Sequence, residues 1–219
     1  VMELLVDSSS LADILKKVPM RHERVCHIAL QIVHGLEALR EEGIQHRDLK
    51  AGNILINVKD HVWIIDFGSA ASSYYKMPPF PGRLVGTPSI IAPEMCRGDF
   101  NDLRSDLFSF GVILYGMLLN RRIPFGTWQG VHDHYSRGEI LDLIDISTLP
   151  PDLQSILRKL FKSDPDDRYQ TPWEVGRDIA RYAVENGLTR ETDHNLYRHF
   201  LGTESPAKNE GSLMAPSAC

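Results

Sequence analysis

The sequence is poor in the features that mark several large classes of protein. It holds three cysteines, and Cys26, Cys96 and Cys219 lie too far apart for a metal-binding or disulfide pattern, which favours a reducing compartment. Its longest apolar run, residues 110–119, is too short and too interrupted by glycine to span a bilayer. Basic residues are not in excess, because 24 Lys and Arg stand against 29 Asp and Glu, so nucleic acid is not an expected partner. We therefore expect a cytoplasmic protein.

The opening of the chain also lacks a secretory signal. It begins with Val1 in the middle of an apolar pattern, and we expect it to be a piece of a longer protein. A length of 219 residues suits one domain or one large lobe with a tail. A chain of this size buries roughly 70–75% of the surface that its unfolded form exposes, so a hydrophobic core needs no disulfide or metal.

Apolar periodicity predicts a mainly α fold with a small β element. The longest helix is expected over residues 21–42, where apolar residues recur every three or four positions and Gly43 suits a C-terminal cap. A helix buried on all sides is expected over residues 102–120, which are apolar nearly all round. Further helical patterns cover residues 8–17, 130–144, 152–161, 171–186 and 189–201.

The β element is expected from two short runs rich in β-branched residues. Residues 53–57 and 62–67 are separated by the turn sequence "VKDH", which predicts a two-stranded ribbon. Residues 69–93 hold five prolines and predict a long irregular loop of the kind that is usually functional. Residues 202–219 have no periodicity and predict disorder.

The stretch "HRDLKAGN" at residues 46–53 places three kinds of chemistry in one loop. Asp48 is suited to accept the proton of a hydroxyl nucleophile, and Lys50 can hold a positive charge beside a migrating phosphate. Asn53 offers an amide oxygen to Mg²⁺, and Asp66, eighteen residues after Asp48, offers a carboxylate to the same metal site. These are the groups that phosphoryl transfer from ATP requires.

The chain resembles the eukaryotic-type (Hanks-type) serine/threonine protein kinases over about residues 1–186. The blocks that carry the resemblance are "HRDLKAGN", "DFG" at 66–68, "GTPSIIAPE" at 86–94, "RSDLFSFGVILYGML" at 104–118 and "DPDDR" at 164–168. The resemblance implies a helical kinase C-lobe with a short β ribbon beside the catalytic loop. It also implies that the γ-phosphate of Mg²⁺-ATP is transferred to Ser or Thr hydroxyls of a protein substrate.

The resemblance assigns a role to each reactive residue. Asp48 resembles the catalytic base, and Lys50 resembles the phosphate-neutralising lysine. Asn53 and Asp66 resemble the metal ligands, while Thr87 resembles the threonine that hydrogen-bonds the catalytic Asp and Lys. Lys50 with Thr87 implies serine/threonine specificity, because tyrosine-specific relatives usually carry an Ala-Ala-Arg arrangement that "DLKAGN" lacks.

A second set of residues is implied to shape the site rather than to react. Its members are His46, Arg47, Phe67, Gly68, Glu94, Asp106 and Arg168. Phe67 and His46 resemble a stacked pair that registers the active state. Glu94 and Arg168 resemble a buried ion pair that braces the substrate-side loop. Asp106 resembles the helix residue that anchors the backbone of the catalytic loop.

The nucleotide contacts implied by the resemblance begin at the start of the chain. The residues implied to contact ATP are Glu3, Leu5, Ser9, Lys50, Asn53, Leu55 and Asp66. Glu3 and Leu5 are expected to bind adenine through their backbone, with Leu55 as the floor of the adenine pocket. Ser9 or Ser10 is expected near the ribose.

The sequence has no glycine-rich G-x-G-x-x-G loop and no strand lysine of the "VAIK" type. We therefore expect a hinge remnant at residues 1–8, a kinase C-lobe at 9–189, one extra helix at 190–201 and a tail at 202–219, with the N-terminal lobe missing from this sequence. Catalysis in the family needs the lysine ion pair and the Asp–Mg²⁺ contact together. The isolated chain is thus expected to bind ATP weakly and to turn over little or not at all.

Two other functions compete with a protein kinase. The first is a pseudokinase or scaffold that uses this lobe only to bind partners, although such proteins often lose Asp48, Asn53 or Asp66, which are all present. The second is a small-molecule phosphotransferase of related fold. Those proteins tend to have Gly where this chain has Arg47, and they lack an "APE" block such as Ala92–Glu94.

Regulation by phosphorylation stays open. In relatives, an Arg at the position of Arg47 often grips a phosphate on the activation loop. The position four residues before Thr87, a common phosphosite, is Arg83 in this chain. The nearest alternative acceptors are Ser72, Ser73, Tyr74 and Tyr75.

Two histidine pairs raise the question of a metal site. They are His132 with His134 and His194 with His199. The second pair is five residues apart, which points the rings to different faces of a helix, and neither pair has a third ligand at metal-site spacing. We interpret them as surface or capping histidines.

Overall fold

The computed structural model describes residues 7–17, 19–72, 91–97, 102–121, 140–190 and 194–202. The helices in these ranges are α1 (Leu11–Leu15), α2 (His22–Glu41), α3 (Pro93–Arg97), α4 (Leu103–Leu119), α6 (Pro151–Leu160), α7 (Pro172–Glu185) and α8 (His194–Leu201). The 3₁₀ turns are η1 (Ala51–Asn53), η2 (Phe67–Ser69), η4 (Ile140–Asp142) and η5 (Pro165–Asp167). The expectation of a mainly α fold with a small β element is confirmed.

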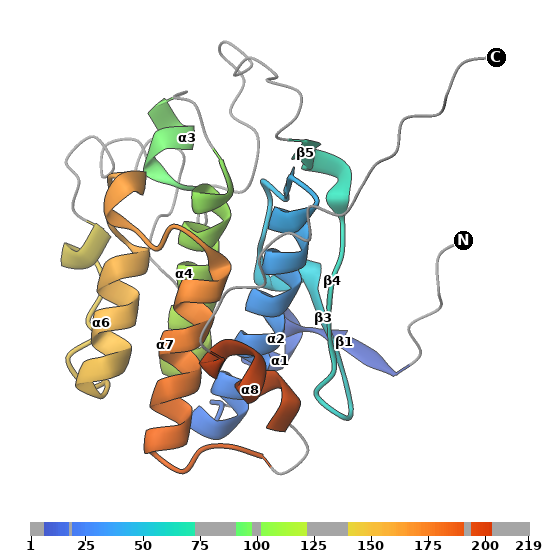
Figure 1. Ribbon diagram of the computed structural model, residues 1–219, viewed down its shortest axis with the longest axis vertical. Helices are drawn as coiled ribbons and strands as arrows, with labels where there is room; N and C mark the ends of the chain where they lie inside the picture. Colours follow the sequence, from blue (N-terminus) through green and yellow to red (C-terminus); the bar gives the residue numbers. More distant parts are fainter. Residues whose placement is uncertain are drawn as a thin grey trace.

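The core is built around α2, which contacts α4, α7 and the strand β4 (Val62–Ile64). Figure 1 shows α6, α7, α4 and α2 running side by side, with the sheet beyond α2. The apolar stripe of α2 includes Ile28, Ile32 and Leu36, which are fully buried. Burying each such side chain stabilises the fold by about 1.5–3 kcal/mol relative to leaving it exposed. The predicted extent of this helix is confirmed, and Gly43 follows it with a φ of 65°.

The helix α4 is buried on most of its faces, as its apolar composition predicts. Asp102 caps its N-terminus by accepting a hydrogen bond from the Arg104 amide at 2.9 Å. Its C-terminus ends at Asn120, which has a φ of 52° and donates its amide to the carbonyl of Gly116. Asn is one of the few residues other than Gly that adopt this left-handed conformation readily.

The main sheet has three strands in the order β1 (Ser8–Ser10), β3 (Ile54–Asn57) and β4, all antiparallel to their neighbours. The predicted ribbon is confirmed as β3 and β4. The helix expected over residues 8–17 is corrected at its start, because Ser8–Ser10 pair with β3 and α1 begins at Leu11. Ser10 ends the strand and caps α1, accepting a hydrogen bond from the Asp13 amide at 3.1 Å. An N-cap residue has extended backbone, so a strand can lead directly into it.

A second, two-stranded sheet joins β2 (Ile44–Gln45) to β5 (Ala71–Ser72). In this sheet Gln45, directly before "HRDLKAGN", pairs with Ala71, which follows "DFG" closely. Of the irregular loop expected over residues 69–93, residues 73–90 lie outside the described ranges. The same holds for residues 130–139 of the expected helix 130–144 and for residues 203–219 of the tail.

The last helix, α8, packs on α7 and α2 and forms the C-terminal part of the predicted range 189–201, whose first two residues are not helical. Its Phe200 ring presses so closely on Gly176 of α7 that a Cβ built at Gly176 meets ring carbons at 2.3 and 2.4 Å. His199 of the same helix lies edge-on to His34 of α2, with ring centroids 5.0 Å apart. Within the described ranges, no helix combines the length and apolarity that crossing a membrane requires.

Candidate active site

The loop at residues 46–53 is anchored to α4 by one buried carboxylate. The amides of His46 and Arg47 donate to the two oxygens of Asp106 at 2.7 and 2.9 Å. Burial raises the pKa of Asp106 to about 6, while the two amide hydrogen bonds and the nearby Arg47 charge oppose that rise. Arg47 has a φ of 66°, so the loop turns through a left-handed residue directly before Asp48.

His46 connects this loop to the "DFG" segment. Its ring is fully buried, and its Nδ1 accepts a hydrogen bond from the Asp48 amide at 3.3 Å. The proton of the neutral ring is then on Nε2, which lies 3.1 Å from the carbonyl oxygen of Ile65 and donates to it. The His46 ring also lies 5.0 Å from the Phe67 ring, so the structure brings this expected pair together in a tilted contact.

Asp48, Lys50 and Asn53 converge as their spacing predicts. The Lys50 ammonium forms an ion pair with Oδ2 of Asp48, whose side chain is 13% exposed. The amide nitrogen of Asn53 donates to the Asp48 carbonyl at 2.9 Å and to its Oδ2 at 3.4 Å. The side-chain oxygen of Asn53 is therefore the atom of that side chain suited to bind a cation. The Asp48 carboxylate and the Lys50 ammonium beside it are both partly exposed.

The β3–β4 pairing brings Asp66 next to this loop. Ile54 pairs with Ile64, and the Ile65 amide donates to the Asn53 carbonyl at 2.9 Å, so Asp66 directly follows a residue bonded to Asn53. Asp66 is exposed and has a φ of 65°, and its carboxylate accepts the Gly68 amide at 3.3 Å. An amide oxygen and an exposed carboxylate fit Mg²⁺, which favours few protein oxygens with phosphates and waters as its other ligands.

Leu55, which is expected to form the floor of the adenine pocket, lies on the outer face of the sheet. Ile54 and Ile56 are buried toward the helices, so the half-buried Leu55 between them lies on the opposite face. Cross-strand register places Ser10 and Trp63 on either side of Leu55.

Ser9 is exposed and pairs with Ile56 rather than with Leu55. Its expected ribose contact, like the adenine contact of Leu55, stays a prediction. Glu3, Leu5 and Thr87 lie outside the described residues, as do His132 and His134. Among the described residues, no three His, Cys, Asp or Glu side chains form a group able to hold a metal ion.

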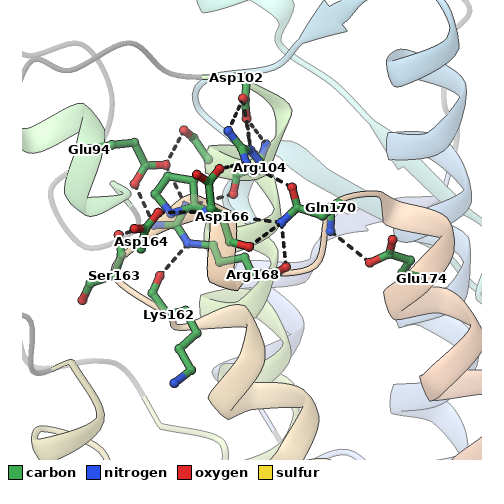
Figure 2. Close-up of polar contacts among 12 residues, drawn as sticks. Glu94, Asp102, Arg104, Lys162, Ser163, Asp164, Asp166, Arg168, Gln170 and Glu174 are labelled. Atoms are coloured by element: carbon green, nitrogen blue, oxygen red, sulfur yellow. Dashed lines mark hydrogen bonds and ion pairs between the residues drawn. The ribbon is translucent and has the colours of Figure 1, made fainter.

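The expected ion pair of Glu94 and Arg168 is bidentate and almost fully buried, with side chains 3% and 0% exposed. Two nitrogens of Arg168 donate to the two carboxylate oxygens at 2.7 and 2.6 Å. The remaining bonds go to three backbone carbonyls, those of Lys162, Ser163 and Arg104, at 2.6 to 3.1 Å (Figure 2). All five N–H donors of the guanidinium thus have an acceptor.

A neighbouring network around Arg104 was not expected from the sequence. Arg104 binds its own helix cap Asp102, at 2.8 to 3.1 Å, and reaches Asp166 at 2.5 Å and Gln170 at 3.0 Å (Figure 2). Gln45, in β2, was also missed, although it donates to the Asp102 carbonyl at 2.7 Å. No local pattern in the sequence marks this contact, because Gln45 is a single polar residue between Ile44 and His46 and its partner lies 57 residues away.

Comparison with known proteins agrees with this geometry. Residues 1–175 match the family described as "Protein kinase domain", and the chain belongs to this family. It is 35% identical over 184 residues to a probable serine/threonine-protein kinase PknB of Bifidobacterium longum, covering 81% of this chain and 26% of that protein. It is 33% identical over 189 residues to serine/threonine-protein kinase PknB of Mycobacterium tuberculosis, covering 83% of this chain and 30% of that protein.

A third relative is serine/threonine-protein kinase pkn2 of Myxococcus xanthus. It is 31% identical over 239 residues, covering 100% of this chain and 26% of that protein. The chain therefore spans between a quarter and a third of the length of these relatives.

Proposed function

We propose that the chain forms the catalytic C-lobe of a serine/threonine protein kinase, which transfers the γ-phosphate of Mg²⁺-ATP to Ser or Thr hydroxyls of a protein substrate. The observation that carries the proposal is the convergence of Asp48, Lys50 and Asn53 in one loop, with Asp66 brought beside them by the β3–β4 pairing. The names of the relatives support the choice of substrate class.

Each group has a distinct part in this reaction. Asp48 orients the attacking hydroxyl and accepts its proton as the new P–O bond forms and the bond from the γ-phosphorus to the bridging oxygen of ATP breaks. The Lys50 ammonium, already paired with Asp48, neutralises charge on the transferred phosphate. Asn53 and Asp66 would hold Mg²⁺, which supplies charge neutralisation for the phosphates.

We further infer that these 219 residues do not complete the nucleotide site. The sequence contains no G-x-G-x-x-G loop and no strand lysine of the "VAIK" type, and both are parts of the kinase machinery. Weak ATP binding and little turnover are therefore expected for the isolated chain. A complete site needs an N-terminal lobe that contributes these two elements.

The test is a phosphorylation assay on the full natural protein with Mg²⁺, γ-labelled ATP and a mixed Ser/Thr peptide library. Asp48→Asn should lower turnover by about 10²–10⁴-fold, the usual contribution of a positioned base. Asp152→Asn, at an exposed position in the first turn of α6, is the matched control and should retain wild-type turnover. Absence of labelling by the wild-type protein, or equal labelling by Asp48→Asn, would refute the proposal and favour a partner-binding scaffold.

A further inference from the structure

Three consecutive residues at the entrance to the catalytic loop bind the N-terminal end of α4. His46 and Arg47 do so through their amides, which donate to Asp106. Gln45 does so through its side chain, whose nitrogen donates to the carbonyl of the helix cap Asp102 at 2.7 Å. Gln45 is 6% exposed, so its carboxamide is withdrawn from solvent and relies on protein partners.

The two partners of Gln45 fix the orientation of its carboxamide. The Asp102 carbonyl can only accept, so the side-chain nitrogen must face it. The Nε of Arg47 can only donate, and it lies 3.4 Å from the Gln45 oxygen, which accepts from it. The first bond is short and the second is long, so Asp102 is the firm anchor and Arg47 is the group being held.

The residue held in this way is under conformational strain. Arg47 has a φ of 66°, a left-handed conformation that is unfavourable for a residue with a Cβ. Such a residue persists only when its surroundings hold it from several sides. Asp106 holds its amide, Gln45 holds its guanidinium, and the next residue along the chain is Asp48.

The anchor of Gln45 is itself braced. Asp102 is bound by Arg104, which also reaches Asp166 and Gln170 in the segment before α7 (Figure 2). The backbone of Gln45 pairs with Ala71 in β5, just after the "DFG" segment. Gln45 thus lies where three parts of the molecule meet: the catalytic loop, the segment after "DFG", and the end of α4 that Arg104 stabilises.

We propose that Gln45 is a positioning residue for the catalytic loop, which acts through Arg47 to set the backbone from which Asp48 projects. This inference rests on the proposed kinase function. Gln45 itself does not touch the reacting atoms. Its loss should therefore slow the chemical step more than it weakens ATP binding.

The experiment compares Gln45→Met with Gln154→Met in the full natural protein. Methionine is close to glutamine in size and removes both polar contacts. Gln154 is the matched control, because its side-chain nitrogen also donates to a backbone carbonyl, that of Leu149 at 2.9 Å, from α6 and outside the catalytic loop. The measurements are kcat, KM for ATP, and hydrogen exchange of the His46 and Arg47 amides.

We expect Gln45→Met to lower kcat roughly tenfold, as loss of a hydrogen bond to a charged group does, with KM for ATP within about twofold of wild type. The two amides should exchange faster than in Gln154→Met. In an Arg47→Met background, the same substitution should lower kcat by less than about threefold, because the group that Gln45 holds is already gone. If Gln45→Met does not fold, Gln45→Asn takes its place, since it keeps a carboxamide in the site but is one methylene too short to reach both Asp102 and Arg47.

A kcat and amide exchange equal to those of Gln154→Met would overturn the inference. So would an undiminished kcat loss in the Arg47→Met background, because Gln45 would then act independently of Arg47. If the wild-type protein phosphorylates nothing, the proposed function fails, while the exchange rates of His46 and Arg47 still decide whether Gln45 orders the loop.

Discussion

The buried pair of Glu94 and Arg168 permits a quantitative prediction about stability. We consider Arg168→Met, which keeps much of the apolar stem and removes the guanidinium. Breaking a buried ion pair by removing one partner typically costs about 3–5 kcal/mol, because the other charge is left buried without compensation. Here the substitution also removes the donors to three backbone carbonyls. The upper part of that range is therefore expected.

The assay is urea and thermal unfolding of the purified chain. For a chain of this size each kcal/mol shifts Tm by roughly 2–4 °C, so a loss of about 4–5 kcal/mol in Arg168→Met should lower Tm by roughly 8–20 °C. The control is Arg181→Met. Arg181 is 54% exposed and lies 3.7 Å from Asp178, and a surface pair of that kind contributes about 0–1 kcal/mol.

A double variant separates the two contributions. Buried ion pairs that are replaced together by apolar residues often leave stability unchanged. In Glu94→Leu with Arg168→Met the charges are gone, but the three carbonyls still lack their donor, so we expect at least about 2 kcal/mol of the loss to remain. A free energy of unfolding of Arg168→Met within about 1 kcal/mol of that of Arg181→Met would refute this reasoning. So would a double variant that is as stable as the wild type.

Three further predictions follow from close contacts, burial and the metal ligands. Gly176→Ala should cost about 1–3 kcal/mol in urea unfolding because its Cβ would meet Phe200 at 2.3 Å, whereas Gly116→Ala, whose Cβ meets nothing closer than 3.6 Å, should be neutral or stabilising. Burial raises the pKa of Asp106 from an ordinary value of 3.8 to about 6, so the folded state keeps a proton that the unfolded chain releases. The contribution of this group to the free energy of unfolding should therefore fall as pH rises from about 4 to about 6. Subtracting the free energy of unfolding of Asp106→Asn from that of the wild type at each pH should isolate this fall. A difference that does not change with pH would contradict the prediction. Asp66→Asn in the full natural protein should weaken the Mg²⁺-dependent part of ATP binding in calorimetry and leave binding without Mg²⁺ unchanged; equal losses with and without Mg²⁺ would exclude the metal role.

The parts of the fold that the sequence predicts well are those that depend on local pattern. Apolar residues recur every three or four positions in α2, and such a spacing places them on one face of a helix, which is then buried. In α4 they lie on nearly all faces, which identifies a helix buried on most of its sides. Asp48, Lys50 and Asn53 were expected to meet because they share one short loop, and the structure brings them together.

The features that were missed depend on partners far away in the sequence. Ser8–Ser10 form a strand because β3, more than forty residues later, offers them an edge to pair with. The contact of Gln45 with Asp102 joins residues that are 57 apart in the sequence. The close contact of Phe200 with Gly176 likewise arises only when α8 folds back onto α7. Neither the secondary-structure propensity of a segment nor the spacing of its apolar residues predicts such contacts.

The most direct test of the central claim is a single-turnover measurement of γ-phosphate transfer. The full natural protein, saturated with Mg²⁺-ATP and mixed with the peptide library, is compared with Asp48→Asn under the same conditions. We predict phosphoserine or phosphothreonine as the product, and a transfer step at least about 10²-fold slower in the variant at similar ATP affinity. Equal transfer rates, or phosphotyrosine as the product, would contradict the assignment of this loop as the catalytic centre of a serine/threonine kinase.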